Sequence, residues 1–145
     1  CNEFSVNGAR VIIDFAQNPH SVSAVTETMA AIPAKRRFVL LGHAGDRSDQ
    51  DIRDLTISAF ALKPDYVVAV EMPEYLRGRE PGEITDLILD ECRVQGLADD
   101  RMILRGTPSE GVASVIDLLA SGDLALLLVL SERDKVFEML ERLTA

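Results

Sequence analysis

Short apolar runs alternate with longer segments of helical periodicity along most of this 145-residue chain, and no other feature restricts its fold as strongly. The runs Arg37–Leu41, Tyr66–Val70 and 124–130 are nearly all apolar and do not alternate with polar residues. Strands of this kind are typical of a parallel sheet buried between helices. We therefore expect an α/β fold with a mostly parallel six-stranded sheet and helices on both faces.

A β-hairpin is expected to open the sheet. Residues 4–6 and 11–15 favour strands, and they flank Asn7-Gly8, a dipeptide that strongly favours a tight hairpin turn. Downstream, apolar residues at helical spacing follow capping residues or prolines, as at Asn18-Pro19. We expect helices at residues 19–32, 49–62, 81–96, 108–119 and 133–143, and one more strand at 102–104.

Composition limits the classes of protein to which the chain can belong. Its length and its content of 47% hydrophobic and 27% charged residues are typical of one globular domain. A formal net charge of -9 argues against a nucleic-acid surface. The longest apolar run, 124–130, is much shorter than the ~18 residues of a membrane span. With only two cysteines and no disulfide framework, we expect a cytoplasmic protein that binds neither nucleic acid nor membrane.

The loop after the hairpin carries the first group of candidate site residues. In open α/β sheets, ligands bind beyond the carboxyl ends of the strands, where this loop is expected. Asp14 could accept a hydrogen bond from a sugar hydroxyl, Asn18 could bond a base or cap the helix, and His20 could face the site. In the alternative interpretation, Asp14 and Asn18 only satisfy turn and cap N–H groups.

A second candidate loop, residues 42–47, follows the strand Arg37–Leu41 and has the sequence Gly-His-Ala-Gly-Asp-Arg. Its backbone amides could approach a phosphate, while Arg47 could bind an oxyanion. The loop does not match the phosphate loop G-x-x-x-x-G-K-[ST], and no lysine stands in that context. The chain also lacks the dinucleotide pattern G-x-G-x-x-G. We therefore expect no nucleotide-triphosphate cradle within it.

Two arginines, Arg77 and Arg79, stand on either side of a glycine in a charged loop. Guanidinium groups can bind a carboxylate bidentately, although such a loop is often only a solvated surface. His20 and His43 are too few for a zinc site, which usually has three or four protein ligands. No metal site is expected.

Three segments together resemble the C-terminal domain of the Mur ligase family. Residues 14–21, Asp-Phe-Ala-Gln-Asn-Pro-His-Ser, resemble the Asp-Tyr-Ala-His-Asn-Pro signature that opens that domain. Residues 45–53 and 76–83 look most like the corresponding domain of cyanophycin synthetase and its relatives. The resemblance spans residues 9–140 and implies a Rossmann-like lid of an ATP-dependent, amide-bond-forming ligase. In such enzymes a carboxylate is activated as an acyl phosphate and attacked by an amine.

The resemblance also implies partners outside this chain. In the family, the phosphate loop and the Mg²⁺ ligands lie on a central domain that precedes the lid, so ATP and Mg²⁺ would be bound mainly there. Residues 1–145 would be the whole lid, inactive alone, and the central domain would belong to the same polypeptide. Closure of the lid would bring its residues to the nucleotide and to an amino-acid or peptide substrate and exclude water.

Site residues carried over from the resemblance fall into three groups. The first would contact the nucleotide, the second would face the reaction centre, and the third would bind the substrate. They are Asp14, Asn18 and His20; Asp46 and Arg47; and His43, Gly45, Arg77 and Arg79.

The segment departs from the signature at Gln17, which replaces a histidine, and at Phe15, which replaces a tyrosine. A role that needs an imidazole at position 17 is therefore not expected. Two alternatives remain: a noncatalytic nucleotide-binding or interaction module of the same fold, favoured by Gln17, and a free-standing enzyme that acts through His43 and Asp46.

Overall fold

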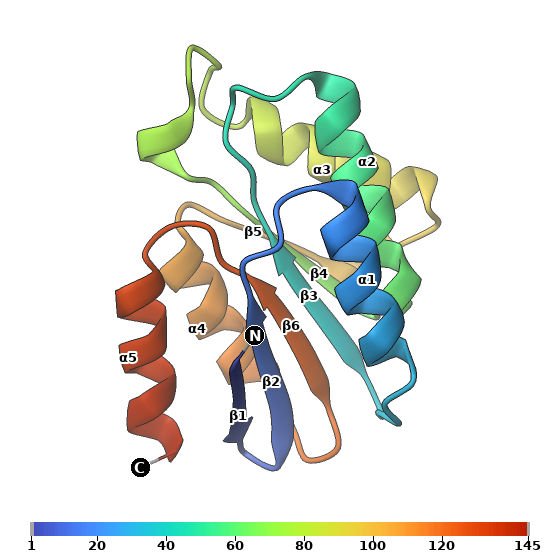
Figure 1. Ribbon diagram of the computed structural model, residues 1–145, viewed down its shortest axis with the longest axis vertical. Helices are drawn as coiled ribbons and strands as arrows, with labels where there is room; N and C mark the ends of the chain where they lie inside the picture. Colours follow the sequence, from blue (N-terminus) through green and yellow to red (C-terminus); the bar gives the residue numbers. More distant parts are fainter. Residues whose placement is uncertain (1, 145) are drawn as a thin grey trace.

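The computed structural model describes residues 2–144 and places one six-stranded sheet between two layers of helices (Figure 1). The sheet order is β1-β2-β6-β3-β4-β5, in which β1 pairs antiparallel with β2 and the other neighbours are parallel. The expected fold class is confirmed. The strands are β1 (Asn2–Val6), β2 (Ala9–Asp14), β3 (Arg37–Leu41), β4 (Tyr66–Val70), β5 (Met102–Arg105) and β6 (Leu124–Leu128).

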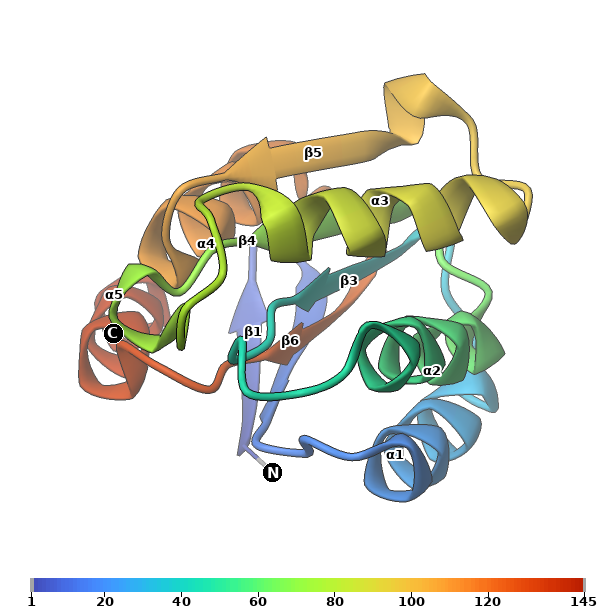
Figure 2. The same ribbon diagram turned by 90° about the horizontal axis from the view of Figure 1, so that it is seen from above.

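In the described part of the chain, five α-helices cover the sheet and divide between its faces (Figure 2). They are α1 (Pro19–Ala30), α2 (Asp49–Ala59), α3 (Glu83–Val94), α4 (Pro108–Leu118) and α5 (Arg133–Thr144). Buried side chains of α1, α2 and α3 join one core cluster, whereas those of α4 and α5 join the other. Within residues 2–144, no helix has the length and apolar character needed to cross a membrane.

Both cores draw on the same strands, because successive side chains of a strand point to opposite faces. In β3, Val39 and Leu41 pack in the cluster beneath α1 to α3, whereas Phe38 and Leu40 pack in the cluster beneath α4 and α5. All four side chains are fully buried. The continuous apolar runs of the sequence follow from this double burial.

Local signals place several element boundaries where the sequence predicts them. Asn7 and Gly8 have φ values of 53° and 80°, the left-handed conformation that a type I′ hairpin turn requires at both central residues. The side chains of Asn18, Ser48 and Thr107 accept backbone N–H bonds at the starts of α1, α2 and α4.

Several boundaries differ from the prediction. Helices α1, α2 and α3 end at Ala30, Ala59 and Val94, two or three residues before their expected ends. Helix α3 begins at Glu83 and not at Pro81, because Gly82 adopts a φ of 89° that interrupts the helical backbone between them. The charged loop before it also contains a short 3₁₀ helix, Pro73–Tyr75. Strand β6 ends at Leu128, two residues before the end of its apolar run, although Val129 is still buried.

Candidate functional site

The loops after β2, β3, β4 and β6 meet at one edge of the sheet. Strand register sets this edge, since Asp14 pairs with Leu128 and Leu41 pairs with Ala69. A cavity of about 550 Å³ opens there. Its lining residues are Gln17, Ala44, Asp46, Arg47, Asp51, Met72, Tyr75, Arg77 and Leu130. The cavity thus lies beyond the carboxyl ends of the parallel strands, as ligand sites in open α/β sheets do.

Two glycines let the loop at residues 42–47 lie directly against the end of β4 and the loop after it. A Cβ atom on Gly42 would lie 2.5 Å from the carbonyl oxygen of Val70, and one on Gly45 would overlap the backbone carbonyl of Leu76. The Gly45 amide donates a hydrogen bond of 2.8 Å to the Tyr75 carbonyl oxygen. The two cavity loops are therefore in backbone contact, which only glycine permits at position 45.

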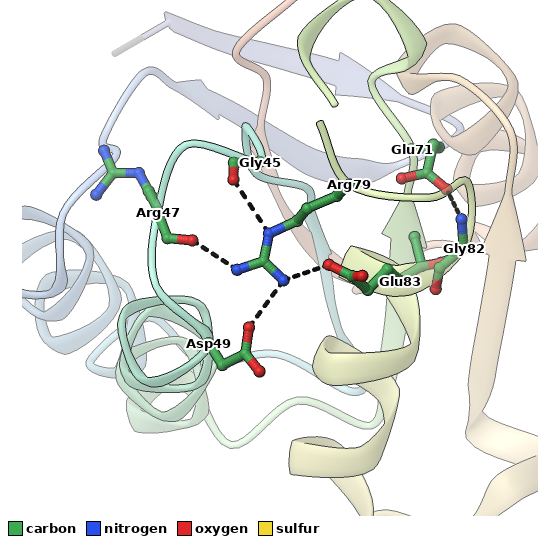
Figure 3. A network of polar contacts seen from close by, with 8 residues as sticks. Gly45, Arg47, Asp49, Glu71, Arg79, Gly82 and Glu83 are labelled. Carbon is green, nitrogen blue, oxygen red and sulfur yellow. Dashed lines mark hydrogen bonds and ion pairs between the residues drawn. The ribbon is translucent and has the colours of Figure 1, made fainter. Parts of the chain in front are cut away.

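Arg79 ties the same two loops together with its guanidinium group (Figure 3). Its Nε and Nη2 donate to the carbonyl oxygens of Gly45 and Arg47, at 3.1 and 2.7 Å. Its Nη1 lies 2.8 Å from a carboxylate oxygen of Asp49 and 2.5 Å from one of Glu83. The side chain is only 15% exposed. The contact between Arg79 and a substrate that the sequence suggests stays a prediction. The N–H donors that such a contact would use already bind four groups of the same chain.

The charges that line the cavity come in both signs. Arg47 and Arg77 bring two guanidinium groups, and Asp46 and Asp51 bring two carboxylates. Arg77 is exposed, and its guanidinium carbon lies 5.2 Å from the ring centroid of Tyr75, within the range of a cation–π contact. The cavity therefore offers separate partners for an anionic and a cationic group of one ligand.

His43 is placed differently from the other residues of its loop. It is 2% exposed, and neither ring nitrogen has a hydrogen-bond partner within residues 2–144. Burial, with a smaller effect of the Arg47 charge, lowers the pKa of His43 to about 3. The imidazole is therefore neutral near pH 7 and does not line the cavity. This geometry does not support a free-standing enzyme that uses His43 as a general base.

The residues predicted to contact a nucleotide lie at the end of β2 (Asp14) and at the start of α1 (Asn18 and His20). Asp14 Oδ1 accepts a hydrogen bond of 2.9 Å from the Ala16 amide, and Asn18 Oδ1 accepts one of 2.9 Å from the Ser21 amide. The turn and cap roles considered for these two residues are therefore both present. The side chains of Asn18 and His20 remain exposed at the start of α1.

The structure brings together three of the predicted site residues, Asp46, Arg47 and Arg77, in one cavity. Sequence reasoning did not assign Asp51 or Tyr75 to the site. Asp51 sits in the first turn of α2, where an acidic residue is common at any helix start. Within residues 2–144, no group of three or more His, Cys, Asp or Glu side chains could hold a metal ion.

Comparison with known proteins agrees with this architecture. The family model described as "Mur ligase, glutamate ligase domain" matches residues 2–129. Cyanophycin synthetase from Crocosphaera subtropica is 29% identical over 127 residues, which cover 87% of this chain and 14% of that protein. The chain thus spans about a seventh of the length of this curated relative.

Two solved structures share the fold at low sequence identity. E. coli FolC, solved in complex with ADP, is 18% identical with a TM-score of 0.68 over 92% of this chain and 29% of that chain. A crystallised domain of a Haemophilus ducreyi protein, proposed to be a UDP-N-acetylmuramate:L-alanyl-γ-D-glutamyl-diaminopimelate ligase, is 17% identical with a TM-score of 0.61. It covers 97% of this chain and 94% of that one. By its match to the family model over residues 2–129, the chain belongs to the Mur ligase family, in its glutamate ligase domain.

Proposed function

We propose that this domain binds the incoming amino acid of an ATP-dependent ligase and presents it to a carboxylate activated on a separate central domain. The charge pattern of the cavity carries the proposal. Arg47 and Arg77 suit the carboxylate of an amino acid, and Asp46 and Asp51 suit its ammonium group. Because an amino acid is a zwitterion, a cavity with both signs of charge complements it better than one with a single sign.

Asp46 and Arg47 are proposed to act nearest the reaction. Arg47 would stabilise negative charge on the acyl phosphate as the amine attacks the acyl carbon and phosphate leaves, and Asp46 would hold the ammonium group and take up the proton that it loses. Gly45 would serve through the close loop contact that it permits. His43 would support the same loop from the interior, since its side chain is buried.

The nucleotide is proposed to contact this domain only at its edge. Asp14, Asn18 and His20 are the residues proposed for it, with the exposed Asn18 and His20 able to bond a base or ribose. Phosphates and Mg²⁺ would be held by the central domain, since this chain has no phosphate loop. ADP in the solved FolC complex supports a nucleotide for a related fold.

Phosphate release from ATP tests the proposal. The chain alone, and a longer protein in which it follows its natural upstream segment, are each assayed with the twenty amino acids. Polyaspartate, folate and muramyl peptide serve as carboxylate substrates. We expect the longer protein to release phosphate only when an amino acid and a carboxylate are both present, and the chain alone to release none. Turnover by the chain alone, or turnover that ignores the amino acid, would contradict the proposal.

A noncatalytic nucleotide-binding module is the second candidate, and Gln17 favours it. Gln17 lines the cavity at the position where the family signature has a histidine, and a carboxamide cannot transfer a proton near neutral pH. In that case the longer protein would bind ATP in calorimetry but release no phosphate with any amino acid in the panel.

A further inference from the structure

Arg79 holds four groups that come from three segments of the chain (Figure 3). The two carbonyl oxygens it binds belong to Gly45 and Arg47, in the loop after β3. The two carboxylates it binds belong to Asp49 and Glu83, which are the first residues of α2 and α3. One guanidinium group therefore fixes a cavity loop to the starts of two helices.

Arg79 itself belongs to the loop after β4, so its contacts join this loop to the loop after β3. Arg79 follows Arg77 by two residues, and its own amide donates 3.0 Å to the Leu76 carbonyl oxygen in the loop after β4. The Gly45 amide binds Tyr75 in that same loop. The Arg79 side chain is 15% exposed, which strengthens its charge-assisted bonds to the two carbonyl oxygens, whereas the Asp49 and Glu83 side chains are 68% and 45% exposed and their ion pairs contribute less. The loops that carry Arg47 and Arg77 are thus held as one unit.

We propose that Arg79 is a positioning residue, which fixes Arg47 and Arg77 at the distance and orientation that the amino acid requires, without touching the amino acid. This inference rests on the function proposed above. Figure 3 shows the guanidinium group of Arg47 directed away from Arg79, while its carbonyl oxygen is held. Arg79 therefore acts on the backbone of Arg47 and leaves the side chain to face the cavity that Arg47 lines.

A direct contact between Arg79 and a substrate carboxylate would need different geometry. Four of the five N–H donors of Arg79 are engaged, so a bidentate carboxylate would displace at least one of the four contacts. Arg79 is also not among the residues that line the cavity. Arg77, by contrast, is exposed and lines it. The carboxylate is therefore assigned to Arg77, and the alignment of the site to Arg79.

The test uses the longer protein described above, with Arg79→Met, Arg79→Lys and the pair Asp49→Asn/Glu83→Gln. The pair weakens the clamp while it leaves Arg79 in place. Arg93→Met is the matched control, because Arg93 lies on α3, is half exposed and pairs with Asp99 away from the cavity. Arg77→Met provides the comparison for a direct contact. Should Arg79→Met fail to fold, Arg79→Lys and the pair decide the question.

Hydrogen exchange gives the first readout. Loss of bonds to a charged group should raise amide exchange at Gly45 at least about tenfold in Arg79→Met, and should raise exchange in residues 75–79 with it. Arg79→Lys should give a smaller rise than Arg79→Met, because the lysine ammonium group can keep some of the four contacts, although it has only three N–H donors. The Arg93→Met control should match the wild type. Unchanged exchange in Arg79→Met would overturn the proposal.

Kinetics with two substrates gives the second readout. The amino acid that supports the fastest turnover is compared with its carboxamide, which lacks the carboxylate. Misalignment in Arg79→Met should lower kcat/KM for both about 10- to 100-fold, and the preference for the acid over the amide should persist. In Arg77→Met that preference should be lost. Loss of the preference in Arg79→Met would overturn the positioning role.

The two readouts separate failure of this inference from failure of the proposed function. If no amino acid supports turnover by the wild-type protein, the proposed function fails. Hydrogen exchange then decides the positioning role alone: coupled loosening of both loops in Arg79→Met supports it, and unchanged loops overturn it.

Discussion

Gly45 is the glycine at which an added Cβ atom would come closest to a neighbouring atom. Its Cβ would overlap the Leu76 carbonyl, which is backbone and cannot rotate away. Gly45→Ala should therefore lower the free energy of unfolding by about 1 to 3 kcal/mol, as measured by urea denaturation. Gly106→Ala is the matched control, because a Cβ there meets only the end of the Glu110 side chain, at 3.4 Å. Equal effects of the two substitutions would contradict the close loop contact.

The buried imidazole of His43 should make the stability of the domain depend on pH. Its pKa falls from 6.5 to about 3 in the folded state. Between those values the unfolded chain takes up a proton that the folded chain does not, so stability declines as pH falls below about 6.5. From pH 7 to pH 5, the wild type should lose about 2 kcal/mol more than His43→Leu. Urea denaturation at each pH measures this difference, and parallel curves for the two proteins would show that the imidazole is accessible to protons.

An ion pair joins the residues that precede β3 and β6, at the edge of the sheet opposite the candidate site. Arg36 Nη2 lies 2.6 Å from Asp123 Oδ2, and the Ala120 amide donates 2.8 Å to the same oxygen. Burial raises the pKa of the Asp123 carboxyl, but the bonds from Arg36 and Ala120 outweigh it, so the pKa lies below its usual value. The carboxylate therefore stabilises the fold at neutral pH, and this stabilisation is lost as acid protonates it.

Replacing this carboxylate tests the tie between the two strands. Asp123→Asn should cost about 1.5 to 3 kcal/mol of unfolding free energy at pH 7, since it removes bonds to a charged partner. The cost should shrink as the pH falls and the wild-type carboxyl becomes protonated. Glu3→Gln offers a control, because its ion pair with Arg10 is about half exposed and should contribute little. A cost that does not change with pH would argue against an ionised Asp123.

Elements were predictable where their signals are local. The hairpin at Asn7-Gly8, the capped start of α1 at Asn18 and the buried strand β3 all follow from a few neighbouring residues. The role of Arg79 could not be predicted in this way, because its partners at Gly45 and Arg47 are more than 30 residues away. Asp51 likewise joins the cavity only through the placement of α2 against the loop after β4. The contacts between loops could therefore not be predicted from the sequence and became known only from the structure.

The folded domain should protect the buried thiol of Cys92 from chemical modification. Cys92 is fully buried in the core beneath α1 to α3, and burial raises the pKa of its thiol to about 12. Because the thiolate is the reactive form, Cys92 should react with a thiol reagent only when the domain unfolds. In a Cys1→Ser background, labelling should follow the urea unfolding transition. Rapid labelling in native buffer would show local opening of α3. Cys1 itself lies outside the described residues.

Taken as one molecule, the domain presents a candidate site at a single edge of its sheet, with two arginines and two aspartates from two loops and the start of α2. The proposed function requires that the cavity at this edge bind the amino acid. The most direct measurement is the KM for the amino acid in the longer protein, compared between wild type, Arg77→Met and the exposed control Arg142→Met on α5.

Loss of a charge-assisted contact to the carboxylate should raise that KM by about tenfold or more in Arg77→Met, and leave it unchanged in Arg142→Met. The KM for ATP should be the same in all three proteins. An amino-acid KM that Arg77→Met does not change would contradict the placement of the amino acid in this cavity.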